Sequence, residues 1–376
     1  MARRLLVVAL SVAFALLPTT AFAHAQLVSS DPAPDAVLET LPVQVSLAFN
    51  EPVTPAGPGI RVYSPSGGQV AGQTRRAGNR LVASLGESQG LRGTYVVLWQ
   101  VEAADTHPSR GAFSFSVGSR TANPYAGLLN GAAIGTTSPL GLVLQAFAHW
   151  LHFAGYALAV GVAAYFALVR REPRLKRLIR AGLALLLVAE PLALVAQLAS
   201  LSFDADTLLG VLSSGFGRLL GLRLAGALML WALLALESPW PILALGAVLA
   251  LVDGAGGHAI RGLPGLGPAL DATHVGAMGV WAGGLVAYLV APDRRFGRVA
   301  LLSFGTAATT GILLALFHGL PAQLFGSDFG RALLLKIGLL AAAVGLAAAG
   351  RRRAEAIAVA TVLLAASLLV SLPPPI

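Results

Sequence analysis

The chain has 376 residues, of which 56% are hydrophobic and only 11% are charged. This composition excludes an ordinary soluble globular protein and is typical of a multi-spanning membrane protein. The formal net charge is +9, but most Arg residues lie in short clusters between apolar runs, which favours membrane topology over nucleic-acid binding. Cysteine is absent, so disulfides, thiolate metal ligands and a cysteine nucleophile are excluded.

Residues 1–23 have the three parts of a secretory signal peptide. Arg3 and Arg4 form a charged start, an apolar run covers Leu5–Leu17, and an Ala-Phe-Ala cleavage motif ends the segment. A first transmembrane helix is the alternative, but a proline interrupts the apolar run before it is long enough to span a bilayer. We therefore expect cleavage to make His24 the mature N-terminus.

Residues 24–120 contain short β-rich runs separated by Pro and Gly. The runs are Val43–Phe49, Ile60–Tyr63, Leu81–Leu85, Thr94–Val101 and Ala112–Val117. Apolar and polar residues alternate within the first and last runs, which predicts strands with one buried face, made of Val43, Val45, Leu47 and Phe49 and of Phe113, Phe115 and Val117. We expect an all-β sandwich, followed by a small and polar linker over 121–138.

Residues 139–376 contain eight apolar segments that can cross a membrane. They lie near 139–169, 178–201, 218–236, 239–256, 268–291, 296–317, 331–350 and 354–372. Basic clusters follow the first, fifth and seventh segments, at Arg170–Arg180, Arg294–Arg298 and Arg351–Arg353. With eight helices these three loops share one side, which the positive-inside rule makes cytoplasmic. The sandwich is then expected on the periplasmic or extracellular side of the cell membrane.

Two pairs of segments repeat within this membrane region. The stretch from Phe216 to Arg223 resembles the stretch from Phe329 to Lys336 at an offset of 113. A weaker repeat, at an offset of 122, relates His149-x-x-His152 to Asp271-x-x-His274, with Gly161 and Gly283 at equivalent positions. The repeats predict two parallel four-helix halves, and sites in such proteins lie between the halves.

The chain has seven histidines, and on this topology none faces the cytoplasm. As an N-terminal residue, His24 offers an amine and an imidazole, and Asp105-x-His107 adds a carboxylate and a second imidazole. These donors suit a tetragonal copper(II) site. The alternative is that Asp105-Thr-His107-Pro is a turn with a capping Asp, and the pattern alone favours neither interpretation.

Several stretches of the N-terminal region resemble the CopC family of periplasmic copper-binding proteins. They are His24-Ala-Gln-Leu-Val-Ser-Ser-Asp-Pro, Phe49-Asn-Glu51-Pro, Gly93-Thr-Tyr-Val-Val-Leu-Trp99 and Asp105-Thr-His107-Pro-Ser-Arg-Gly111. The membrane region resembles CopD through Gly257-His258-Ala259, His274-x-x-Ala277-x-x-x-Trp281 and Phe329-Gly-Arg331 to Lys336. The resemblance covers nearly the whole mature chain, as in fusions of the two families. It implies a CopC-type Greek-key sandwich, immunoglobulin-like or cupredoxin-like, joined to an all-α membrane domain.

The resemblance to CopC also implies which residues bind metal. His24, Asp105 and His107 are the implied copper(II) ligands, and Glu51 lies where the family has a nearby acidic residue. Some members carry a Met-rich loop for copper(I), but the corresponding stretch, Arg61–Val70, contains no Met. A separate copper(I) site in this domain is therefore not expected.

Ionisable side chains also occur within the predicted membrane segments, where they are costly and usually functional. We expect His149, His152, Asp271 and His274 to form one outward-facing metal-accepting cluster, because the i, i+3 spacing places each pair on one helix face. His258 and His318 lie at outward helix ends and are further candidate ligands. Glu190 precedes a proline and belongs either to a transport path or to a helix kink. The basic residues of the first repeat are interpreted as snorkelling: Arg218, Arg223, Arg331 and Lys336.

These features predict a copper-handling membrane protein, not an enzyme, that captures copper(II) outside and passes it to the membrane domain for transport toward the cytoplasm. The chain has no Walker-type sequence, so no ATP hydrolysis is expected. The expected partners are the copper ion, the lipid bilayer and other periplasmic copper carriers, and not nucleic acid. Two alternatives remain: a copper-brace oxidase, and a haem b electron-transfer protein with paired imidazole ligands.

Overall fold

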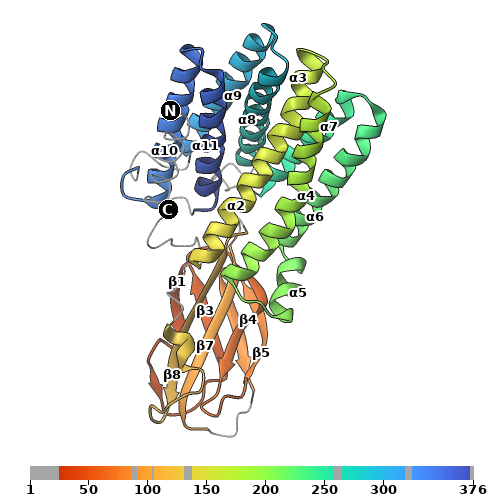
Figure 1. Cartoon of the computed structure of the whole chain (residues 1–376). Coiled ribbons are helices and arrows are strands. Elements are labelled where there is room, and N and C mark those ends of the chain that lie inside the picture. Colours follow the sequence, from red (N-terminus) through yellow and green to blue (C-terminus); the bar gives the residue numbers. More distant parts are fainter. Residues whose placement is uncertain are drawn as a thin grey trace. The chain divides into compact units, whose positions relative to one another are not determined.

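The computed structural model describes residues 25–86, 91–103, 106–130, 138–256, 265–317 and 324–372 (Figure 1). These residues divide into two compact units. The β unit combines the described part of Thr20–Leu142 with Ala196–Arg218. The helical unit combines Val143–Val195 with the described part of Leu219–Ile376. The stretch from 196 to 218, which the sequence placed among the membrane helices, therefore groups with the strands.

The β unit contains a sandwich of two four-stranded sheets. One sheet has the order β1-β3-β6-β5 and the other β2-β8-β7-β4. The strands are β1 (Leu27–Asp31), β2 (Val37–Leu38), β3 (Gln44–Phe49), β4 (Thr54–Tyr63), β5 (Ala71–Ala77), β6 (Arg80–Leu85), β7 (Gly93–Glu102) and β8 (Pro108–Val117). Strand β2 pairs parallel with β8, and the other pairs are antiparallel. The predicted all-β sandwich is confirmed.

The alternation of apolar residues correctly predicts most of the sandwich core. Phe49 and Phe115 are at most 1% exposed, and their neighbours on the same faces, Val45, Leu47, Phe113 and Val117, are also buried. The prediction was wrong for Val43, which is 82% exposed because it precedes the start of β3. Strands β1 and β5 were not predicted, because they are outer strands with mostly polar, exposed residues.

The start of the expected linker packs onto the sandwich. The buried side-chain amide of Asn123 donates hydrogen bonds to the carbonyl oxygens of Ser64 (2.9 Å) and Thr94 (2.8 Å). The ring of Tyr125 stacks on the ring of Tyr63 with centroids 4.0 Å apart. These contacts fasten the chain to the sheet immediately before it leads to the first membrane helix.

The helices match the eight predicted apolar segments closely. Among the residues that the structure describes, seven helical stretches are long and apolar enough to cross a membrane, and α7 is a shorter apolar helix. The helices are α2 (Pro139–Tyr156), continued by a π-turn (Ala157–Gly161) and α3 (Val162–Leu168), then α4 (Leu175–Ser200), α5 (Ala205–Ser213), α6 (Gly215–Leu233), α7 (Pro239–Ala255), α8 (Leu266–Val290), α9 (Phe296–Phe317), α10 (Asp328–Ala348) and α11 (Arg352–Val370). Short helix α5 was not predicted.

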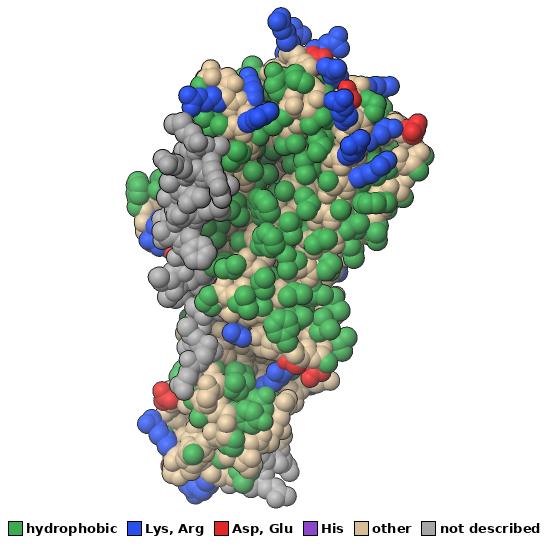
Figure 2. Space-filling model, viewed as in Figure 1, with side chains coloured by type: hydrophobic (Ala, Val, Ile, Leu, Met, Phe, Trp, Pro, Cys, Tyr) green, Lys and Arg blue, Asp and Glu red, His purple; other side chains and the backbone are tan. Residues whose placement is uncertain are grey.

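The surface of the helical unit fits a membrane environment. Figure 2 shows hydrophobic side chains covering its visible flank and Lys and Arg side chains gathering at one end. The exposed apolar residues include Leu301 and Leu302, each 73% exposed, on α9. An apolar band bordered by basic loops is typical of a polytopic membrane protein.

The two halves of the helical unit meet at the glycines that the weaker repeat pairs. A Cβ added to Gly283 on α8 would lie 1.9 Å from the Ala157 carbonyl oxygen and 2.9 Å from the Gly161 Cα. A Cβ added to Gly161 would lie 2.0 Å from the Gly279 carbonyl oxygen. Only small residues permit such close backbone packing between membrane helices. The two glycines that the offset of 122 pairs therefore pack directly against each other.

Candidate functional site

In the β unit, hydrogen bonds bring residues 25 and 26, which follow His24 in the sequence, beside the segments that contain two other candidate ligands. The Ser109 hydroxyl donates to the Ala25 carbonyl oxygen at 2.9 Å. The Gln26 backbone amide donates to Asn50 Oδ1 at 2.8 Å, and the Asn50 backbone amide donates to the Gln26 carbonyl oxygen at 3.1 Å. Residue 25 therefore lies between the segment that contains Glu51 and the segment that contains His107.

His107 lies in the connection between β7 and β8 and is only 7% exposed. The Ala103 amide donates to the His107 carbonyl at 2.9 Å, and the Thr106 amide donates to the Ala103 carbonyl at 3.0 Å. Thr106 has a φ of +70°, a left-handed conformation that is unfavourable for a β-branched residue. Such a conformation persists only where surrounding contacts hold it.

One of those contacts comes from α4. Gln197 Nε2 donates to the Thr106 carbonyl oxygen at 3.1 Å and to Glu102 Oε1 at 3.5 Å. A Cβ added to Gly215, at the start of α6, would lie 3.6 Å from the Thr106 side chain. The turn that carries His107 is thus held by residues from the two helix ends that belong to the β unit.

Glu102 is the buried acid at the centre of this contact. Its side chain is 2% exposed, and it accepts a hydrogen bond from the Ser214 hydroxyl at 3.0 Å. Burial raises the pKa of Glu102 to about 7, although Ser214, Gln197 and the Phe216 backbone amide partly oppose the shift. Glu102 was not predicted as important, because a single acid at the end of a strand has no distinguishing sequence pattern.

The remaining candidate ligands of the β unit are only partly described. Glu51 is half-buried and its Oε1 atom is inaccessible to solvent. His24 and Asp105 lie outside the described residues, as do His258 and His318 of the membrane region. Whether these four bind metal therefore stays a prediction from the sequence.

In the first half of the helical unit, His152 belongs to a buried network of charged side chains. Its Nδ1 lies 2.7 Å from Glu190 Oε1, and its Nε2 lies 3.1 Å from Asp253 Oδ2. Arg223 Nε donates to the other oxygen of Asp253 at 2.8 Å. Glu190 thus contacts the histidine directly, and Arg223 turns inward to Asp253, so its interpretation as a snorkelling residue was wrong.

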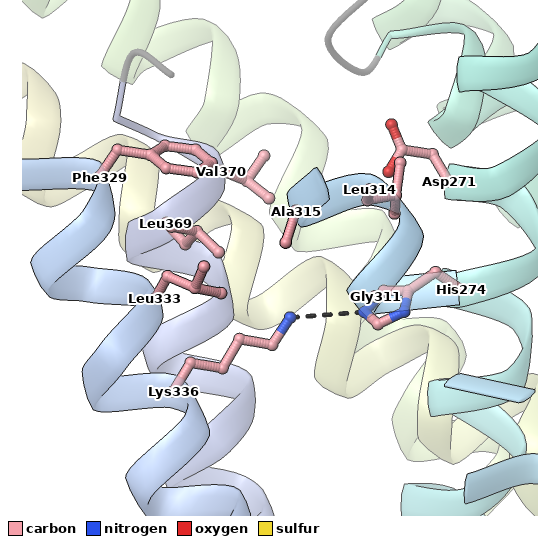
Figure 3. Close-up of a pocket in the computed structure, with 10 residues that line it drawn as sticks. All are labelled: Asp271, His274, Gly311, Leu314, Ala315, Phe329, Leu333, Lys336, Leu369 and Val370. Carbon is pink, nitrogen blue, oxygen red and sulfur yellow. Dashed lines mark hydrogen bonds between the residues drawn. The ribbon is translucent and has the colours of Figure 1, made fainter. Parts of the chain in front are cut away.

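In the second half, His274 has a different set of partners. Its Nδ1 lies 2.9 Å from the Ala307 carbonyl oxygen and 3.2 Å from Thr310 Oγ1, and its Nε2 lies 3.4 Å from Lys336 Nζ. Figure 3 shows Lys336 extending from α10 toward the imidazole, with Asp271 on the same helix as His274. The interpretation of Lys336 as a snorkelling residue was therefore also wrong.

Asp271, His274 and Lys336 line a pocket of about 110 Å³ (Figure 3). The same three residues, together with Met278 and Ala366, line a neighbouring hollow of about 90 Å³. Asp271, His274 and Met278 follow one another at i, i+3 and i+7 on α8, so they form one stripe along that helix. The stripe offers a carboxylate, an imidazole and a thioether, and Met278 was missed because single methionines are common in helix cores.

The hydrogen-bond partners determine which nitrogen of each histidine is available to a metal. Carboxylates only accept hydrogen bonds, so both nitrogens of His152 carry protons and neither has a free lone pair. A carbonyl oxygen also only accepts, so His274 donates from Nδ1 to Ala307, and the lone pair of the neutral ring is on Nε2. The two histidines therefore differ in their capacity to bind a metal ion.

The single cluster expected from the sequence is not formed by the described residues. His152 and His274 have separate sets of partners, and His149 Nδ1 lies 3.0 Å from the Ser371 hydroxyl. In the described part of the chain, no three His, Asp or Glu side chains converge on a common metal position. The physical reason is that carboxylates on α4 and α7 surround His152, so it has no free nitrogen to share with the Asp271–His274 pair.

Comparison with known protein families finds two matches in this chain. The model described as the CopC domain matches residues 27–118. The model described as copper resistance protein D matches residues 293–364. The first match covers the sandwich, and the second covers α9, α10 and the first two thirds of α11.

Curated relatives extend these matches. Copper transport protein CutJ of Bacillus subtilis (strain 168) is 26% identical over 361 residues, which cover 86% of this chain and 66% of the relative. The chain thus spans slightly less than two thirds of the length of that relative. Copper resistance protein C of Xanthomonas campestris pv. juglandis is 32% identical over 114 residues, which cover 28% of this chain and 89% of the relative.

Solved structures of similar proteins cover the sandwich region. The crystal structure of CopC from Methylosinus trichosporium OB3b is 27% identical and covers 27% of this chain and 100% of that chain, with a TM-score of 0.24. The structure of PcoC, a methionine-rich copper resistance protein from Escherichia coli, is 29% identical and covers 25% and 99%, with a TM-score of 0.23.

Proposed function

This chain belongs to the family of copper-resistance and copper-transport proteins that join a CopC domain to a CopD domain, and from this we propose that it captures copper(II) outside the cytoplasmic membrane and delivers it inward. The β unit is the capture site, with His24, Asp105 and His107 as ligands and Glu51 nearby. The helical unit accepts the ion and carries it toward the cytoplasm. The activity is binding and transport, without a catalytic step.

One observation supports the capture site most strongly. The Ser109–Ala25 and Asn50–Gln26 hydrogen bonds hold the residue that follows His24 beside the segments that contain His107 and Glu51. These three segments are far apart in the sequence, and fold stability alone does not require ligand-type residues beside each contact. The arrangement fits a site that uses a free N-terminal amine, an imidazole and carboxylate oxygens, which copper(II) accepts in tetragonal geometry.

In the helical unit, we propose Asp271 and His274 as the acceptor site and assign His152 to the structural network of the first half. His274 retains a lone pair on Nε2, and the pocket beside it has room for an ion. The haem alternative requires two imidazoles with a free nitrogen, which His152 does not offer in this arrangement.

Copper binding and accumulation by the full chain test this proposal. We expect the purified protein to bind copper(II) with an EPR spectrum that changes in His107→Ala, and cells expressing the protein to accumulate more copper than cells without it. An extra residue placed before His24 should weaken binding sharply, because the amine–imidazole chelate is lost. An unchanged spectrum in His107→Ala would contradict the assignment of that ligand, and peroxide-driven turnover would indicate an oxidase instead.

A further inference from the structure

Lys336 is the side chain that faces the available lone pair of His274. Its ammonium group lies 3.4 Å from Nε2, and an ammonium can only donate hydrogen bonds. It therefore occupies the position from which a metal ion would bind that nitrogen. Asp271 lines the same pocket, so the local arrangement consists of one cation, one carboxylate and one imidazole.

We propose that Lys336 is a tethered cation that occupies the Asp271–His274 pocket until a copper ion displaces it. This inference rests on the proposed function, and it adds which group neutralises the acceptor site before a copper ion binds. An ammonium group balances the charge of Asp271 while the site is empty, which avoids an unpaired carboxylate within the membrane. A metal ion brings its own positive charge, so the ion and the ammonium compete for the same place.

The side chain on this position suits reversible displacement. Lysine carries a compact charge on a flexible four-carbon stem, and it lacks the planar group with which arginine makes two fixed hydrogen bonds to a carboxylate. Phe329 and Leu333 of α10 also line the pocket, and they provide an apolar surface along which the stem can move (Figure 3). Gly311 leaves room for the imidazole, because a Cβ there would lie 3.0 Å from His274 Cε1.

In the first half of the helical unit, the residue equivalent to Lys336 is a cation that is fixed in place. An offset of 113 relates Lys336 to Arg223, which is fixed to Asp253 at 2.8 Å and does not face a free lone pair. The same offset relates Asp253 on α7 to Ala366 on α11, and Ala366 lines the hollow beside His274. The second half therefore has no carboxylate at the position of Asp253, and its cation, Lys336, faces His274 instead.

The donors beside Lys336 indicate a transition-metal ion such as copper and not a hard cation. Imidazole suits copper among other transition metals, whereas magnesium and calcium prefer sites made entirely of oxygen. Asp271 and His274 serve copper(II), and Met278, which lines the neighbouring hollow, adds a soft thioether for copper(I). Both oxidation states therefore belong in the test.

The experiment uses the full chain with His24→Ala and His107→Ala, so that the β unit contributes neither of its proposed imidazole ligands. Copper(II) binding is followed by EPR, and copper(I) binding is followed under reducing conditions by competition with a chromogenic chelator. We expect Lys336→Leu to raise the affinity for at least one oxidation state tenfold or more, because the competing charge is removed and no new copper ligand is added. Lys336→Arg should not raise it. Adding His274→Ala to Lys336→Leu should abolish the gain.

Two controls keep the outcomes distinct. Lys336→Gln removes the charge while keeping a polar side chain, so it replaces Lys336→Leu if the leucine variant does not fold. Equal or weaker binding in a folded Lys336→Leu or Lys336→Gln protein, or failure of both variants to fold, would overturn the tethered-cation role. Failure of the chain with intact His107 to bind copper(II) would instead overturn the proposed function of the β unit.

Discussion

The two halves of the helical unit place a histidine at the same repeat position and surround it in opposite ways. Around His152, carboxylates from α4 and α7 accept hydrogen bonds from both ring nitrogens, and Arg223 completes a network with two acids and two cations. Around His274, a carbonyl and a hydroxyl contact one nitrogen, and a lysine faces the other. The neighbouring side chains, and not the histidine itself, decide whether the position is closed or available.

The difference extends along the whole repeated stripe. The offset of 122 relates Tyr156 of the first half to Met278 of the second. Both residues line the hollow beside His274, but the Tyr156 hydroxyl donates to the Gly246 carbonyl at 2.9 Å. One copy of the repeat therefore uses this position to join two helices, and the other copy places a thioether beside the same hollow.

The largest expected effect comes from disrupting the buried network around His152 in the first half. Asp253→Ala leaves Arg223 without its carboxylate and His152 with one partner fewer, and removing one member of a buried ion pair typically costs about 3–5 kcal/mol. We expect a large loss of thermal stability in detergent and a low yield of folded protein. Asp271→Ala should cost about 1 kcal/mol or less, because Asp271 is not fixed in such a network. Equal losses for the two variants would remove the distinction between the halves.

A buried acid with neutral partners should behave differently from Asp253. Because burial raises the pKa of Glu102 from 4.5 to about 7, its contribution to stability is full below pH 4.5 and is lost as the pH rises through 7. The change amounts to at most about 3 kcal/mol. Thermal unfolding of the full chain between pH 5 and pH 8 should show this loss, and Glu102→Gln should reduce it. A pH profile that is unaffected by Glu102→Gln would contradict the assignment.

A carboxylate introduced at position 366 of the second half should fix Lys336 in place, as Asp253 fixes Arg223 in the first half. Ala366→Asp places an acid where the repeat has Asp253. We expect it to hold Lys336 by charge and to lower the affinity of the pocket for copper about tenfold, equivalent to about 1.4 kcal/mol, and so to lower copper accumulation in cells. Ala366→Ser, which adds a neutral polar group, should have little effect. Unchanged accumulation in a folded Ala366→Asp protein would show that Lys336 does not control this pocket.

The smallest expected effect concerns the end of α4 that belongs to the β unit, where Gln197 holds the turn beside His107. Gln197→Ala removes the donor to the Thr106 carbonyl, and we expect a fewfold loss of copper(II) affinity and a shifted EPR spectrum, since one neutral hydrogen bond contributes about 1 kcal/mol. Gln73→Ala, on the exposed strand β5, is the matched control. An identical spectrum in both variants would show that Gln197 does not position the turn.

The sequence predicted the elements of this fold better than the partners of its polar side chains. Periodicity located the sandwich core through Phe49 and Phe115, and run length located the membrane helices. The i, i+3 spacing correctly identified His152 and His274 as unusual, but spacing within one helix contains no information on what a neighbouring helix presents. The single expected cluster depended on that missing information.

The repeat did contain a usable signal for part of the site. The offset of 113 pairs Arg223 with Lys336. A cation at the same position of both copies, within a membrane region, predicts a buried partner better than it predicts a side chain that snorkels to the surface. Asp253 was overlooked because one acid near the end of an apolar helix is also compatible with a helix end in water. Met278 was overlooked because its position on the stripe of His274 becomes meaningful only when the pocket is known.

The contact between Gln197 and the Thr106 carbonyl has a consequence for how this protein can be divided. The described β unit takes its residues from two stretches of the chain, and the first membrane span and most of the second lie between them. A gene fragment that ends at residue 120 would encode the sandwich with Glu102 uncovered and Arg110 separated from the Leu201 carbonyl, to which it donates at 2.5 Å. The copper affinity measured on such a fragment would differ from that of the full chain, because the fragment lacks residues 196–218, which form part of the same compact unit.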